Sequence, residues 1–169
     1  MAAKAATVRE LLLSMLWADR LILGAVRPVK SEDLTRDAGV SFRSVLGTLA
    51  HTLISQRLWL SRFLGNPLTV LPRLDEYPDL PAWIAGWEEM ASQIEAFLAG
   101  LSDDQLATPL TWASLPDGAV HTLPLWHAVI HLVNHSTYHR GQVVSLLRQM
   151  GYSVPHTDLI VFFTERAAG

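Results

Sequence analysis

The sequence contains no cysteine. Disulfide bridges, thiolate nucleophiles and cysteine metal ligands are therefore excluded from its chemistry. A basic tract is also missing, because 13 lysines and arginines are scattered along 169 residues that include 16 acidic residues. Proteins that bind nucleic acids usually carry a basic patch or stripe, so we expect no nucleic-acid partner.

Long hydrophobic runs are absent as well. No stretch approaches the roughly 20 apolar residues that cross a bilayer. The apolar run Leu11–Trp17 is bounded by charged residues and is not followed by the cleavage site of a secretory signal. We therefore expect a cytoplasmic protein with no membrane partner.

Apolar residues are plentiful and they follow a helical pattern. Half of the chain is hydrophobic, which is enough for the core of a single domain spanning residues 1–169. Apolar side chains recur at three- and four-residue steps over about residues 5–26, 41–64, 80–99 and 122–150. A proline-rich stretch between residues 66 and 81 predicts a crossover that covers one end of a bundle. We predict an all-α four-helix bundle.

The segment before the last long helix has a different pattern. Residues 109–122 contain alternating and β-prone residues around a Pro-Asp-Gly turn, which predicts a small β-hairpin. Thr122 is the expected cap of the last helix, and Ser41 is the expected cap of the second. A further short helix is expected near Leu159–Arg166.

Histidines carry the strongest chemical signal. Four of the seven, His127, His131, His135 and His139, are spaced four residues apart on the last predicted helix. Adjacent members of such a row share a face and can bind one metal ion together. Three consecutive members cannot, because the outer two lie roughly 12 Å apart along the axis. One ion therefore takes an adjacent pair and a third ligand from another segment.

The pair that faces inward is His135 and His139, because these residues interrupt an apolar stripe formed by Leu125, Ala128, Leu132, Val143 and Leu146. His51 is the only histidine inside another predicted helix, where the small residues Gly47 and Ser55 leave room beside it. We predict that His51, His135 and His139 bind one divalent metal ion. The alternative is that these are hydrogen-bonded core or surface histidines, since pairs at this spacing also occur by chance. His121 and His156 are assigned no role.

Two segments carry a family resemblance. His131-Leu-Val-Asn-His-Ser-Thr-Tyr-His-Arg-Gly-Gln142 resembles the signature of the DinB/YfiT-like metalloenzymes, in which two histidines precede Arg-Gly-Gln. The segment from Ser44 to His51, followed by Trp59-Leu-Ser-Arg62, is similar to the helix of that family that carries the first histidine. (The DNA polymerase of the same name is unrelated.)

The resemblance implies an up-down-down-up bundle, often dimeric, with a metal triad that maps onto His51, His135 and His139. It implies zinc or nickel first, and iron, copper or another divalent ion next, because nitrogen ligands suit all of these. It also implies either a metal-dependent enzyme, a thiol-dependent transferase or a hydrolase of unknown substrate, or a stress-related protein that binds a metal or small molecule without turnover.

The sequence assigns no catalytic residue. A hydrolase needs a general base, and Asp19, Glu88 and Glu95 are candidates that sequence alone cannot place near the metal. For Arg140 and Gln142 we expect helix–helix or dimer contacts, although Gln142 or Asn134 is alternatively a hydrogen-bond partner of a ligating imidazole.

Overall fold

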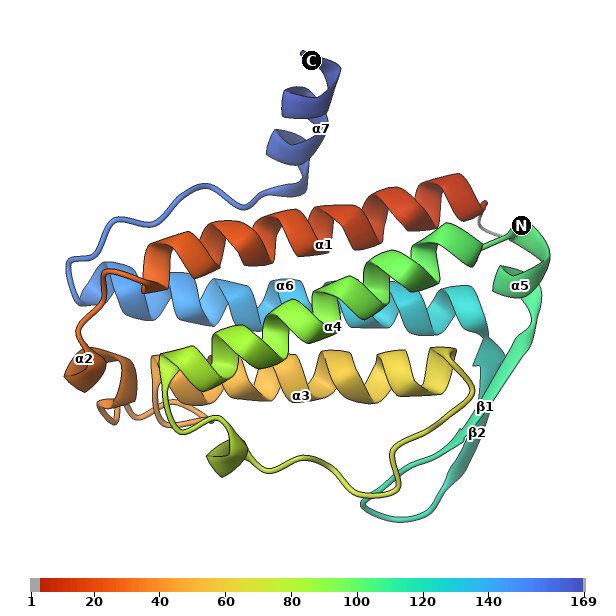
Figure 1. Cartoon of the computed structure of the whole chain (residues 1–169), viewed down its shortest axis with the longest axis horizontal. Helices are drawn as coiled ribbons and strands as arrows, with labels where there is room; N and C mark the ends of the chain where they lie inside the picture. The colour runs from red at the N-terminus through yellow and green to blue at the C-terminus, as the bar shows by residue number, and fades with distance from the viewer. Residues whose placement is uncertain (1–3, 169) are drawn as a thin grey trace.

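The structure is a computed structural model that describes residues 4–168. Its main elements are four long helices, α1 (Ala5–Val26), α3 (Val45–Phe63), α4 (Leu80–Gly100) and α6 (Leu125–Gln149). They lie side by side, with α1 and α6 running in one direction and α3 and α4 in the other (Figure 1). The predicted all-α bundle with an up-down-down-up course is confirmed.

The core lies between these helices. α6 packs against both α1 and α3, and α4 packs against the same two helices. The side chains most completely excluded from solvent come from all four helices and include Leu12, Met15, Leu53, Met90, Ile94, Leu132 and Leu147. Truncating one such leucine to alanine typically costs about 2–5 kcal/mol of stability. Because α6 is enclosed between α1 and α3, its inward side chains meet residues of both.

Shorter elements connect the long helices and follow them: α2 (Ser31–Thr35), the 3-10 helix η1 (Leu74–Glu76), α5 (Asp103–Ala107), β1 (Pro109–Ala113), β2 (Val120–Pro124) and α7 (Leu159–Ala167). β1 and β2 pair antiparallel, with Pro109 opposite Pro124 and Ala113 opposite Val120. The predicted hairpin before the last long helix is therefore confirmed. The short helix α5 was not anticipated.

Two predicted helix starts are wrong. α3 begins at Val45, not near Ser41, because Ser44 provides the cap and its hydroxyl accepts a hydrogen bond of 3.0 Å from the Gly47 amide. α6 begins at Leu125, because Thr122 belongs to β2 and its hydroxyl lies 2.8 Å from that of Thr111.

The crossover from α3 to α4 follows a different path from the predicted one. It runs back alongside α3 instead of over one end of the bundle (Figure 1). Tyr77, which is buried in this segment, accepts a hydrogen bond of 2.9 Å from Arg57 on α3. Its ring also occupies the space beside Gly86, where a Cβ atom would come within 2.7 Å of it. The crossover thus fixes α3 against α4.

Over residues 4–168, we find no helix that is both long enough and apolar enough to cross a membrane.

Candidate metal centre

Two of the four histidines of α6, His135 and His139, point toward the bundle interior at consecutive turns. His139 is 6% exposed and lies between the buried residues Ser136 and Val143. His135 is half-buried, and His131, one turn earlier, is exposed. This gradient follows from helical geometry, because four residues overshoot one turn and each earlier histidine is rotated further from the core.

The structure brings the rings of His51, His135 and His139 together. One nitrogen atom from each ring lies within 4.8 Å of the other two. Nε2 of His135 and Nε2 of His139 are 3.2 Å apart. Two ligands of a tetrahedral zinc ion, at bond lengths of 2.0–2.1 Å, are separated by about 3.3 Å. The α6 pair therefore has the spacing of two ligands, and His51 from α3 completes a group that could hold one ion.

The remaining histidines of the described chain lie outside this group. His131 has its ring centroid 5.8 Å from that of His135, but it packs edge-on against Trp59 at 5.0 Å. His121 packs against Trp112 on the hairpin, with ring centroids 5.5 Å apart.

Gln142 orients the His139 ring. Its Oε1 atom lies 2.8 Å from Nδ1 of His139. An amide oxygen accepts hydrogen bonds, so Nδ1 donates and Nε2 keeps its lone pair for the centre of the triad. This is one of the two roles considered for Gln142 from sequence. Nδ1 of His135 is buried and has no partner among the described residues, so its tautomer is not fixed in the same way.

Phe42 covers the imidazole ring of His51. It stacks on His51 with centroids 3.8 Å apart and planes inclined by 12°, and its edge meets His139 at 5.4 Å. Phe42 is held there by a tight turn before α3, in which Arg43 has a φ of +67°. Gly47 permits this turn, because a Cβ atom there would clash with the Phe42 carbonyl. Sequence analysis missed Phe42, since nothing in its spacing marks the contact.

The environment keeps the imidazoles of His51 and His135 neutral. Burial, with a smaller contribution from the neighbouring His139, lowers the pKa of both His51 and His135 to about 4. Partial desolvation, with a smaller contribution from the Arg62 charge, also lowers the pKa of the more exposed His131. Imidazole must be neutral to bind a metal ion, so His51 and His135 are in the binding-competent form at neutral pH.

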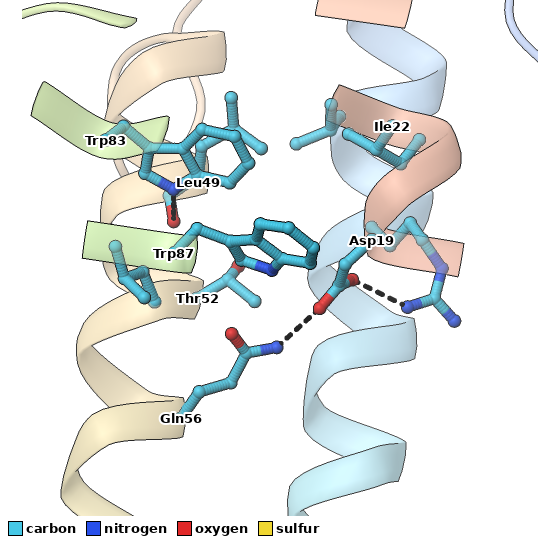
Figure 2. A pocket seen from close by; sticks show the side chains of 10 residues that line it. Asp19, Ile22, Leu49, Thr52, Gln56, Trp83 and Trp87 are labelled. Carbon is cyan, nitrogen blue, oxygen red and sulfur yellow. Dashed lines mark hydrogen bonds and ion pairs between the residues drawn. The ribbon is translucent and has the colours of Figure 1, made fainter. Parts of the chain in front are cut away.

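A buried polar network lies beside the triad. Figure 2 shows the Asp19 carboxylate of α1, which accepts hydrogen bonds from Gln56 of α3 at 2.7 Å and from Arg140 of α6 at 3.3 Å. Gln56 also donates to Ser136 at 3.2 Å. Ser136 and Arg140 directly follow His135 and His139 in sequence, so the network fixes the rotation of α6 at the level of the metal candidates.

Asp19, one of the candidate general bases, is held within this network. Burial raises the pKa of its carboxyl, and the Arg140 guanidinium and the Gln56 amide partly offset that effect. A small cavity of about 20 Å³ between Asp19, Trp83 and Trp87 adjoins the network (Figure 2). The interaction with Asp19 makes Arg140 a helix–helix contact, as expected. Gln56 and Ser136 were missed.

Carboxylates are not part of the triad. Within residues 4–168, the cluster of candidate ligands consists of the three histidines alone. Asp19 is bound to Arg140, and Glu95 forms an exposed ion pair with Arg20. Glu88 is exposed on α4, and none of these three carboxylates belongs to the cluster.

The fold and the site together define a helical-bundle protein with three histidines able to hold a metal ion. The DinB family model matches residues 1–167, and the chain belongs to this family. It is 29% identical over 156 residues to Protein DinB of Bacillus subtilis (strain 168), covering 88% of this chain and 90% of that protein. The crystal structure of a DinB-like protein from Bacillus cereus ATCC 10987 has a TM-score of 0.61 at 21% identity, covering 86% of this chain and 94% of the other.

Proposed function

We propose that the protein binds one divalent metal ion through His51, His135 and His139. The observation that carries the proposal is the meeting of three imidazole nitrogens within 4.8 Å, two of them 3.2 Å apart. Zinc and nickel are the leading candidates, followed by iron and copper, because all accept nitrogen ligands. Membership of the DinB family supports the same three residues as ligands.

The protein residues around the ion would have distinct tasks. Gln142 holds His139 with Nε2 directed inward. Phe42 restricts the His51 ring by stacking on it. Asp19 and Arg140 fix α6 against α1, so that His135 and His139 keep their spacing. These contacts hold the three rings close together before any ion arrives, which lowers the cost of binding.

The proposed activity is that of a metal-dependent enzyme, either a thiol-dependent transferase or a hydrolase. An ion with three neutral nitrogen ligands keeps a position for water, thiol or substrate and lowers the pKa of the group bound there. The two reactions stay alternatives: a hydrolase would need a general base near the reacting water, supplied by a group other than the three histidines of the cluster.

The alternative function is a non-catalytic protein that binds a metal or a small molecule, in a stress response for example. A panel of thiol acceptors and esters assayed with metal-loaded protein separates the two. Turnover that is abolished by a chelator supports the enzyme. If no compound of the panel is turned over, the non-catalytic binding function is supported instead.

A homodimer in the cytoplasm is the proposed state of the molecule. Exposed apolar side chains on α7, including Ile160 at 66% exposed, support association. The lack of cysteine suits a reducing compartment. Light scattering at micromolar concentration tests the dimer, and a monomer would contradict it; cell fractionation tests the compartment.

Elemental analysis tests metal binding. Protein purified without chelators should contain about one metal ion per chain, and the His139→Ala variant should contain little. A matched His127→Ala variant, altered on the same helix outside the triad, should keep its metal. Full metal content in His139→Ala would refute the assignment.

A further inference from the structure

A groove of about 260 Å³ lies at one end of the bundle, away from the triad. The end of α3, the end of α4, the start of α6, α5 and the hairpin gather there (Figure 1). The groove is open to solvent. Its wall combines the apolar side chains Phe63, Phe97, Leu110 and Leu125 with three polar side chains, Arg62, Gln105 and Thr108.

Arg62 is the unusual member of this wall. Its side chain is buried, with the residue only 8% exposed, and no carboxylate of the described residues pairs with it. Its only hydrogen bond within residues 4–168 goes to the Ala113 carbonyl at 3.4 Å. Burial lowers the pKa of the guanidinium, and no neighbouring negative charge opposes that effect. The guanidinium nitrogens without a protein partner are not among the solvent-inaccessible unpaired atoms of the described residues, so they remain accessible from the open groove.

A comparison with Arg140 shows that Arg62 lacks a negatively charged partner. Both arginines are 8% exposed. Arg140 is paired with Asp19 at 3.3 Å and also donates to Thr137 at 2.9 Å. Arg62 has instead the faces of Trp59 and Trp112, with its Cζ atom 4.5 Å and 5.8 Å from the two ring centroids. Cation–π contacts hold the guanidinium in place but leave most of its five N–H donors without a protein acceptor and open to the groove.

We propose that this groove binds a small molecule with an apolar body about the size of one ring and an oxyanion head group, a carboxylate or a phosphate, with the head group on Arg62. The planar guanidinium matches either oxyanion with two parallel hydrogen bonds. Phe63, Phe97 and Leu110 receive the apolar body. Gln105 adds an amide donor, since its Oε1 already accepts from the Ser102 amide and its Nε2 is available.

The groove is a separate site from the proposed metal centre, so this inference does not depend on metal binding. The two are nevertheless neighbours. Trp59 contacts Arg62 on one side and His131 on the other, with ring centroids 5.0 Å apart, and His131 lies one turn from His135. A ligand on Arg62 should therefore change the fluorescence of Trp59 and Trp112 even in metal-free protein.

Calorimetric and fluorescence titrations of the chelator-treated full chain test the proposal. The probes are phenylacetate, phenyl phosphate and the neutral analogue phenylacetamide. We expect saturable binding of one anion or both with a dissociation constant of about 1 mM or below. The amide should bind at least about tenfold more weakly, since it lacks the charge-assisted bonds. The stronger of the two anions identifies the head group.

Arg62→Gln should weaken anion binding at least about tenfold. Arg57→Gln removes an arginine of the same helix that bonds to Tyr77 and Glu89 and does not line the groove, and it should leave anion binding unchanged. If Arg62→Gln does not fold, the wild-type comparison of anions with the amide still decides. Failure of both anions to saturate, equal binding of the amide, or full binding in a folded Arg62→Gln variant would overturn the proposal.

Discussion

Nε2 of His135 and Nε2 of His139 lie 3.2 Å apart on consecutive turns of α6. Gln142 engages the other nitrogen of His139, so its Nε2 presents a lone pair to its neighbour. Without a cation, the contact is favourable only if His135 carries its proton on Nε2. A metal ion between the two rings would use both lone pairs and would extend the same arrangement to His51, whose ring centroid is 4.6 Å from that of His139.

Replacing Gln142 by alanine should weaken metal binding without unfolding the protein. The His139 ring loses the acceptor that fixes its tautomer, and partners of this kind typically contribute about 10–100-fold in affinity. Competition with a chromophoric chelator measures the change. Gln149→Ala, an exposed position of the same helix, serves as the control and should match wild type. Equal affinities for the two variants would show that Gln142 has no such role.

Phe42→Ala should expose the His51 ring to water. Burial is the main cause of the low pKa of His51, so the value should rise from about 4 toward 6.5. An NMR titration of the histidine ring protons in chelator-treated protein measures this. Phe163→Ala, on the exposed part of α7, should leave the titration as it is in wild type. An unchanged His51 pKa in Phe42→Ala would contradict the stacking argument.

The stability of the metal-free protein should depend on pH in a defined window. The pKa of His51 and His135 is about 4 in the folded chain and 6.5 in an unperturbed side chain. Below pH 6.5 the unfolded chain therefore binds protons that the folded chain does not, and the free energy of unfolding falls as the pH drops toward about 4. Above pH 6.5 both forms are neutral, and these groups contribute no slope.

Urea denaturation between pH 7.5 and pH 5 measures how the free energy of unfolding changes with pH. Most carboxyl groups titrate below this range. A His51→Gln/His135→Gln double variant provides the control, because it lacks both groups. Its free energy of unfolding should change less over this range than that of wild type. Parallel curves for the two proteins would exclude these histidines as the cause.

Asp19→Ala should be strongly destabilising, by about 3–5 kcal/mol, because it leaves the buried Arg140 guanidinium without its partner. Adding Arg140→Met to this variant should restore part of the loss, since the unpaired charge is then removed. Arg20→Ala is the matched control; its ion pair with Glu95 is exposed and contributes less than about 1 kcal/mol. Chemical denaturation of wild type, Asp19→Ala, Arg140→Met and the double variant completes the cycle, and additive effects of the two substitutions would contradict the account.

Much of the fold could be predicted because apolar periodicity and glycine terminators are local signals. The bounds of α1 match the predicted residues 5–26, and Gly65 and Gly151 follow the ends of α3 and α6 with positive φ angles. Helix starts were harder, because several side chains compete to cap the same helix. Ser41 and Ser44 are both residues that favour a helix cap. Ser44 is the cap because Gly47, which has no Cβ to clash with the Phe42 carbonyl, allows the turn that brings its amide to the Ser44 hydroxyl.

Some residues of the candidate site could be predicted from local sequence signals and others could not. The pair on α6 follows from helical spacing, and His51 follows from being the only histidine inside another long helix. Phe42, Gln56 and Ser136 could not be found, because their roles depend on contacts between segments distant in sequence. It could not be predicted either that the cluster in the described residues contains no carboxylate. In the sequence, nothing distinguishes Asp19 from an acidic residue that acts as a general base.

Anomalous diffraction from crystals of the zinc-loaded protein tests the central claim most directly. The account predicts one strong zinc peak per chain, at about 2.0–2.1 Å from a ring nitrogen of each of His51, His135 and His139. A structure with no peak between these three rings, or with zinc held by other residues, would contradict it.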